Sequence, residues 1–160
     1  MRRLKQAAVV VVVLFALAQL IRPQRANPPI DPSRTIKAHL SATSALVPVL
    51  DRSCGDCHSY ATEWRWYSKV APLSWAMAYA VNHGRQTINF SEWSAYSPER
   101  RKSMLAASCY DAHTGKMPGL YTLFRSDTRL SAEDVETICS ASRQTEAKAS
   151  DALTPVRRQP

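Results

Sequence analysis

The stretch Cys54-Gly55-Asp56-Cys57-His58 decides how this 160-residue chain is interpreted. Two thiols at this spacing lie on one helical turn, where each can reach one vinyl group of the same porphyrin. The residue directly after the second thiol then places an imidazole under the iron as its proximal ligand. The pattern therefore predicts one covalently attached c-type haem, with Cys54 and Cys57 as the thioethers and His58 as the iron ligand.

Other interpretations of the motif are a redox-active disulfide, half of a zinc site, or coincidence. A thioredoxin-like motif is expected near a βαβ pattern, and the sequence shows no such strands. A zinc site needs a second ligand pair at similar spacing, but the remaining cysteines, Cys109 and Cys139, stand far apart. Haem attachment is therefore the favoured interpretation.

Composition favours one small helical domain. Hydrophobic residues make up 45% of the chain, and glycine occurs only 4 times. The first value is ordinary for a globular protein, and the apolar residues recur mostly at helical spacing. We therefore expect an all-α domain, to which a covalent haem would add apolar surface that so small a core lacks.

The formal net charge of +8 is concentrated at the two ends of the chain. Between Asp31 and Ser150, 14 Lys and Arg residues stand against 12 acidic residues. No basic stripe with interleaved aromatic residues is present, so we expect no nucleic-acid partner.

The N-terminus has the form of an export signal. The basic residues Arg2, Arg3 and Lys5 precede a nearly unbroken apolar run over 7–21. The run is short for a spanning helix, which needs about 17 to 25 residues, and Ala16-Leu17-Ala18 is an acceptable cleavage site. Residues 1–21 are therefore either a cleaved signal peptide or an uncleaved membrane anchor. Both place the domain on the periplasmic side of the cytoplasmic membrane of a bacterium.

The remaining boundaries follow from composition. Residues 22–40 contain four of the ten prolines, which favour extended backbone, so this segment is expected to be a tether without a core of its own. Residues 147–160 form a polar tail that is expected to fray. The haem-binding domain is then expected over residues 41–146.

Helix start and stop signals predict the elements of this domain. The expected helices are Pro48–Ser53 leading into the haem motif, Pro72–His83 ended by Gly84 with Arg85 in the next loop, a short helix capped by Asn89, a helix opened by Ser97-Pro98 and running to about His113, and a helix capped by Ser131 and running to about Ser142.

Two groups of side chains are candidates for the haem pocket. Residues 64–75 hold three of the four tryptophans and form either an aromatic core or a wall against the porphyrin, or both. In the second case Trp66 and the hydroxyl of Tyr67 reach towards the haem propionates. Arg85 can hold a propionate through its planar guanidinium, although an ordinary surface arginine is the alternative.

The distal side of the iron has several candidate ligands. Met117 follows a glycine and precedes a proline in a loop, where its thioether can be held at one point, and a distal methionine suits an electron carrier. The alternatives are a methionine that fills a core gap, ligation by His83 or His113, and an open position.

Cys109 and Cys139 are expected on the inward faces of two helices. In an oxidising compartment such a pair favours a disulfide, with two buried free thiols as the alternative.

Taken together, the chain from about residue 46 to 142 resembles the bacterial haem-binding domain family, a monohaem c-type cytochrome-like module often found behind one N-terminal membrane segment. Arg65, where the family usually has proline, and Arg125-Ser126, in place of a frequent His-Pro, depart from its pattern. The resemblance rests on residues 53–59, Trp64, Trp66-Tyr67-Ser68, Ala71-Pro72, Ser74-Trp75, Gly84-Arg85, residues 89–93, Gly115, Met117-Pro118, Tyr121 and Leu130-Ser131.

The resemblance implies a small cytochrome c-like helical fold with one haem c, while the redox partner of the family is unassigned. By similarity to small cytochromes c, the carbonyl of Pro72 is expected to accept a hydrogen bond from Nδ1 of His58.

Two functional classes follow. The favoured one is one-electron transfer in the periplasm, by a carrier rather than an enzyme. The alternative is a haem-based sensor of gas or peroxide, or a small peroxidase-like enzyme, with an open or exchangeable distal site. A haem-stabilised interaction domain is a third class.

Overall fold

The computed structural model describes residues 1–40 and 44–153, with side chains described up to residue 144. Every regular element in these ranges is a helix, so the expected all-α class is confirmed for the described part of the chain. In chain order the elements are α1 (Arg2–Ala18), η1 (Pro32–Arg34), α2 (Ile36–His39), α3 (Leu46–Ser53), α4 (Gly55–His58), η2 (Trp66–Lys69), α5 (Leu73–Thr87), η3 (Phe90–Ala95), α6 (Pro98–His113), η4 (Gly119–Leu123), η5 (Ser126–Thr128) and α7 (Ala132–Leu153).

One hydrophobic cluster joins α3, η3, α6 and α7. Leu50 of α3 and Ile138 of α7 are almost fully buried in it, together with Phe90 and Trp93 of η3 and Leu105 of α6. The disulfide between Cys109 of α6 and Cys139 of α7 lies beside this cluster, with its sulfur atoms 1.95 Å apart. The core therefore fixes α3, which leads directly into the haem motif on α4.

The expected helix caps are confirmed. The side chain of Asn89 accepts a hydrogen bond from the amide of Ser91, and that of Ser97 accepts one from Arg100. The hydroxyl of Ser131 accepts a hydrogen bond from the amide of Asp134 at the start of α7. Ser, Asn and Asp at such positions satisfy amides that have no partner within the helix.

Three expected helix boundaries were wrong. The first domain helix begins at Leu46 and not at Pro48, because a proline is tolerated anywhere in the first turn. Helix α5 continues through Gly84 to Thr87, so Arg85 lies in the helix and not in a loop. Helix α7 continues to Leu153, because no glycine or proline interrupts residues 131–154.

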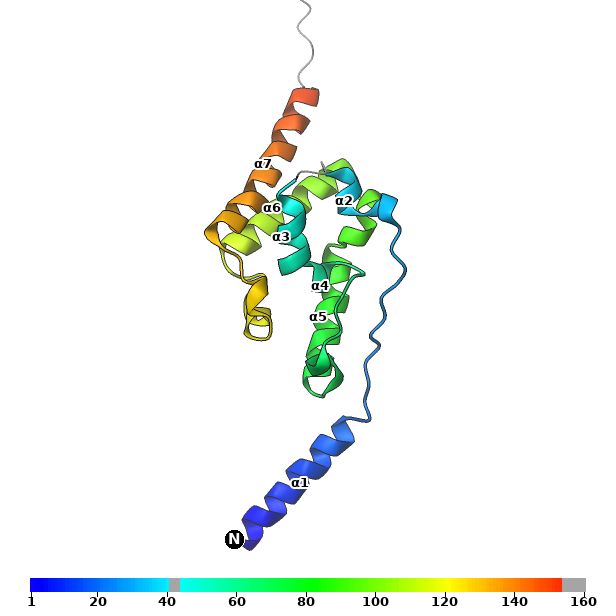
Figure 1. The fold of residues 1–160 in the computed structure, drawn as a ribbon, viewed down its shortest axis with the longest axis vertical. Coiled ribbons are helices and arrows are strands. Elements are labelled where there is room, and N and C mark those ends of the chain that lie inside the picture. The colour runs from blue at the N-terminus through cyan, green and yellow to red at the C-terminus, as the bar shows by residue number, and fades with distance from the viewer. Residues whose placement is uncertain (41–43, 154–160) are drawn as a thin grey trace, which may run out of the picture.

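Helix α1 lies apart from the domain, with its apolar side chains exposed (Figure 1). Among the helices in the described residues, none combines the length and the apolar character required to cross a membrane. Whether residues 1–21 serve as a cleaved signal or as an anchor stays a prediction.

Residues 22–40 were expected to be a tether outside the core, but Ile36 of α2 is buried in the hydrophobic cluster. Residues 19–27, which we call the strap, form a turn after α1 and then a stretch without regular secondary structure (Figure 1). The strap runs along η2 and α5 and is hydrogen-bonded to the domain there. The backbone amide of Ala71 donates to the side chain of Gln19 over 2.9 Å, and the indole N–H of Trp75 donates to the carbonyl of Ile21 over 2.8 Å. Extended backbone leaves its polar groups unpaired, and side chains of the domain satisfy them here.

Candidate functional site

The haem motif consists of Cys54, which lies between α3 and α4 and caps both, and of the four residues of α4. The amide of Cys54 donates to Leu50 at the end of α3 over 2.9 Å. Its carbonyl accepts from the amides of Cys57 over 3.2 Å and His58 over 3.0 Å. Because α3 is anchored in the core, this continuity places both thiols and the imidazole on one fixed helical turn.

The ring of His58 is held from one side. Its Nδ1 atom lies 3.1 Å from the carbonyl oxygen of Gly84 and 3.1 Å from that of Ile88. Carbonyl oxygens only accept hydrogen bonds, so Nδ1 carries the proton and Nε2 keeps its lone pair. Burial lowers the pKa of His58, which favours the neutral imidazole that ligates metals.

The expected role of Pro72 at this histidine was wrong. The carbonyl of Pro72 accepts hydrogen bonds from Trp75 and Ala76 over 3.1 and 3.3 Å, at the start of α5. Its side chain is exposed, and no contact with His58 is described. The acceptors for His58 come from the other end of α5 because that end, and not its start, packs against the motif.

Gly84 permits this packing. A Cβ atom at this position would lie 3.0 Å from the carbonyl carbon of Cys57 and closer still to the oxygen. Only glycine allows the backbones of α4 and α5 to approach so closely. The residue that we had interpreted as a helix stop is therefore a contact point between α5 and the haem motif.

The two thiols of the motif are free. Burial raises the pKa of Cys54 to about 12 and that of Cys57 to about 11. Redox-active C-x-x-C motifs depend on a lowered thiol pKa, so the environment here is the opposite of theirs. The described residues also bring together no group of three or more His, Cys, Asp or Glu side chains that could hold a metal ion, as a zinc site requires.

An open groove lies between η2 and the end of η4. It is lined by Arg65, Trp66, Tyr67, Leu123 and Phe124 and has a volume of about 500 Å³, within the range of small-molecule and cofactor sites. The side chain of Trp66 is 72% exposed, whereas Tyr67 is buried. The rings of Tyr67 and Phe124 contact each other in the lining of the groove, with their centroids 5.4 Å apart.

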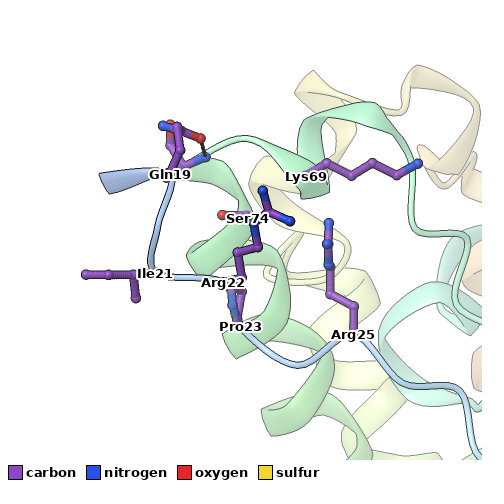
Figure 2. Close-up of a pocket in the computed structure, with 8 residues that line it drawn as sticks. Gln19, Ile21, Arg22, Pro23, Arg25, Lys69 and Ser74 are labelled. Carbon is purple, nitrogen blue, oxygen red and sulfur yellow. Dashed lines mark hydrogen bonds between the residues drawn. The ribbon is translucent and has the colours of Figure 1, made fainter. Parts of the chain in front are cut away.

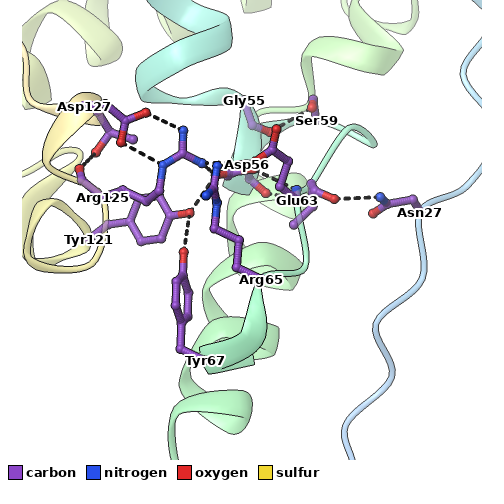
Figure 3. Close-up of polar contacts among 12 residues, drawn as sticks. Asn27, Gly55, Asp56, Ser59, Glu63, Arg65, Tyr67, Tyr121, Arg125 and Asp127 are labelled. Carbon is purple, nitrogen blue, oxygen red and sulfur yellow. Dashed lines mark hydrogen bonds and ion pairs between the residues drawn. The ribbon is translucent and has the colours of Figure 1, made fainter. Parts of the chain in front are cut away.

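A polar cluster connects this groove to the haem motif (Figure 3). The hydroxyl of Tyr121 donates to the carboxylate of Asp56 over 2.6 Å and lies 3.2 Å from the hydroxyl of Tyr67. Burial and these two hydrogen-bonded partners raise the pKa of Tyr121, so it remains a donor. The predicted contact of Tyr67 with a propionate is not tested, and the described partner of its hydroxyl is Tyr121.

Arg125 completes the polar cluster. Its guanidinium contacts Asp56 over 3.1 Å and Asp127 over 2.6 Å. Hydrogen bonding to Asp127 raises the pKa of Arg125 above its usual value. Sequence reasoning missed the role of this residue. Its one signal was an arginine where the resembling family often has histidine, and this signal did not pair Arg125 with Asp56.

All three nitrogen atoms of the Arg85 guanidinium donate hydrogen bonds to protein oxygens. Arg85 donates to the carbonyls of Ser59 and Ala26 over 2.8 Å each, and to the side chains of Asn27 and Thr62 over 2.8 and 2.9 Å. These contacts join the strap to the loop after the haem motif. The described partners of Arg85 therefore give no support to its predicted contact with a haem propionate.

The candidate distal ligands lie on different elements. Met117 lies in the loop before η4, where its side chain is 42% exposed. His83 lies on α5, stacked on Tyr79 with ring centroids 5.8 Å apart, and His113 is the exposed last residue of α6. No described hydrogen bond or ring contact joins any of these side chains to His58. His83 lies close enough that its charge helps to lower the pKa of His58, after the larger effect of burial. The distal ligand therefore stays a prediction.

These residues fit a haem. The site offers two free thiols, an imidazole with its Nε2 available, and an aromatic groove of cofactor size nearby.

The chain matches the family model for a haem-binding domain over residues 13–144. No curated protein and no solved structure matches it. The matched region covers most of the chain, and the chain therefore belongs to the haem-binding domain family, which assigns haem as its cofactor.

Proposed function

We propose that the chain holds one haem covalently through Cys54 and Cys57, with Nε2 of His58 as the proximal iron ligand. The observation that carries this proposal is the arrangement of His58, whose Nδ1 is committed to two backbone carbonyls. A hydrogen bond of this kind fixes the tautomer and raises the basicity of an iron ligand. The adjacent free thiols supply the two attachment points at the spacing that a porphyrin requires.

The proposed activity is one-electron transfer. Bound haem supplies an iron that takes up and releases one electron, and Met117 is the proposed distal ligand. A peroxide-cleaving site would need a distal histidine and a free arginine, and His83 with Arg85 was the pair nearest to this pattern. Arg85 donates to four protein oxygens, and this supports a carrier over a peroxidase-like enzyme.

The proposed location is the periplasmic side of the bacterial cytoplasmic membrane. Arg2, Arg3 and Lys5 at the start of α1, followed by the exposed apolar residues of the same helix, support export, with the N-terminus on the cytoplasmic side. A redox partner protein is expected there, and its identity is open to capture experiments.

Ferric and ferrous absorption spectra of the exported protein, made with c-type maturation factors, test this proposal. A methionine-ligated carrier has low-spin spectra in both states and binds carbon monoxide slowly. Replacing Met117 with Ala should open the iron to carbon monoxide, whereas His113→Ala should not. Fast binding of carbon monoxide by the unaltered protein would exclude the saturated iron and favour a sensor.

A further inference from the structure

The strap passes η2 and the start of α5 (Figure 2), and hydrogen bonds hold it to the domain at several points. Besides the contacts of Gln19 and Ile21, the guanidinium of Arg25 donates to the carbonyl of Ser68 in η2 over 2.9 Å. The side-chain nitrogen Nε2 of Gln19 also donates to the backbone carbonyl of Ala71 over 3.4 Å. A spacer would need none of these contacts, so the strap belongs structurally to the haem-binding domain.

Asn27 is the strap residue with the most side-chain contacts to the domain. Its Oδ1 atom accepts from the guanidinium of Arg85 over 2.8 Å and from the indole N–H of Trp64 over 3.1 Å. Its Nδ2 atom donates to the carbonyl of Thr62 over 2.8 Å. Both ends of the amide are therefore used, and no aliphatic side chain could replace them.

Arg85 transmits this contact to the haem motif. Its Nε donates to the carbonyl of Ser59, the residue that follows His58 and ends α4. Arg85 also follows Gly84, whose carbonyl is one acceptor for Nδ1 of His58. One side chain thus connects the backbone directly after His58 with the end of α5, whose carbonyls hold the imidazole.

Thr62 provides a second link on the same side. Its hydroxyl accepts from Arg85 over 2.9 Å and donates to the carbonyl of Asp56, inside the motif, over 2.6 Å. In the view of Figure 3, Asn27 approaches the motif from the side opposite to Arg125. The haem motif is therefore braced by polar contacts on two sides, one from the strap and one from the segment after η4.

We propose that Asn27 is a positioning residue of the haem site and acts through Arg85 on the orientation of His58. This inference rests on the proposed role of His58 as the iron ligand. Loss of the Asn27 amide leaves donors of Arg85 and Trp64 and the carbonyl of Thr62 without their partner. The two backbone segments around His58 then move more freely, the Nδ1 hydrogen bond weakens, and the imidazole becomes a poorer donor to iron.

Three variants of the full chain test the inference. Asn27→Ala removes all three hydrogen bonds of the side chain. Asn27→Asp keeps an acceptor for Arg85 and Trp64 but loses the donor to Thr62. Gln24→Ala is the matched control, because Gln24 is an exposed residue of the same strap.

The measurements are the reduction potential of the haem and peptide-level hydrogen exchange over residues 59–62 and 84–88. Asn27→Ala should raise the potential, because a less basic ligand favours ferrous iron. It should also speed exchange in both segments by about tenfold, as local opening becomes easier. Asn27→Asp should be intermediate, and Gln24→Ala should match the unaltered protein.

Equal potentials and equal exchange in Asn27→Ala and Gln24→Ala would overturn the inference. If Asn27→Ala does not fold, equal potentials and equal exchange in Asn27→Asp and Gln24→Ala would overturn the inference instead. A chain that carries no haem refutes the proposed function on its own. Exchange in the haem-free chain then still decides whether Asn27 braces residues 59–62 and 84–88.

Discussion

A carboxylate oxygen of Asp56 lies 3.1 Å from a guanidinium nitrogen of Arg125, and each of the two side chains keeps only 12% of its surface exposed. Asp56 stands between the two cysteines of the haem motif, and Arg125 directly follows the groove residues Leu123 and Phe124. The ion pair therefore fixes one wall of the groove to the motif itself.

Replacing Arg125 with Gln should destabilise the fold by about 2 to 4 kcal/mol, because it leaves the nearly buried carboxylate of Asp56 without its charged partner. Urea unfolding of the two proteins measures the difference. The matched control is Arg65→Gln, which removes an arginine whose ion pair with Glu63 is largely exposed. Exposed pairs contribute less than about 1 kcal/mol, so equal effects of the two substitutions would contradict this account.

Replacing Gly84 with Ala should loosen the contact between α5 and the haem motif. The added methyl group meets the carbonyl of Cys57, and such overpacking destabilises by about 1 to 3 kcal/mol. Gly55→Ala is the control within the motif, since its Cβ would meet the nearest backbone atom at an ordinary 3.6 Å. The expected result is less haem-loaded protein for Gly84→Ala than for Gly55→Ala, measured as haem absorbance per polypeptide. The opposite order would argue against a close approach at Gly84.

Removing the disulfide between Cys109 and Cys139 should destabilise the fold. The bond joins residues 30 positions apart, and closing a loop of that length contributes about 3 to 4 kcal/mol on the chain-entropy model. The double variant with serine at both positions should lose about this much in urea unfolding. Dithiothreitol should weaken the unaltered protein and leave the double variant unchanged. An equal effect of the reductant on both proteins would show that the bond contributes nothing.

Asp127 should contribute to stability in a pH-dependent way. Its hydrogen bonds to Arg125 lower the pKa of the carboxyl from 3.8 to about 2. A carboxyl whose pKa is lower in the folded state stabilises the fold above its unfolded pKa, and this contribution is lost as the pH falls through the folded value. The stability difference between the unaltered protein and Asp127→Asn should therefore shrink between pH 3.8 and about 2. A difference that stays constant across this window in urea unfolding would contradict the assignment.

Local signals in the sequence were enough to predict much of the fold. The caps at Asn89, Ser97 and Ser131 depend on residues within one turn of the helix start, so their chemistry can be read without the structure. The extent of α6 followed from the same kind of signal. The haem motif is likewise a contiguous pattern, and family membership supports haem as the cofactor.

Contacts between distant segments could not be predicted in this way. Gly84 has the local appearance of a helix stop, and only its packing against Cys57 shows why α5 continues through it. Arg125 and Asp56 lie on segments that the fold alone brings together. The strap is a stronger case, because its proline-rich sequence carries no signal for the side chains that dock it. The expectation of extended backbone over residues 22–40 also missed the helices η1 and α2.

The central claim, covalent attachment of one haem through Cys54 and Cys57, is tested most directly by the intact mass of the exported protein after denaturation and extraction with acidified organic solvent. We predict that the polypeptide retains its pigment and that its mass exceeds that of the bare chain by one haem. Cys54→Ala combined with Cys57→Ala should abolish both. A colourless polypeptide with the mass of the bare chain, recovered from the unaltered protein, would contradict the claim.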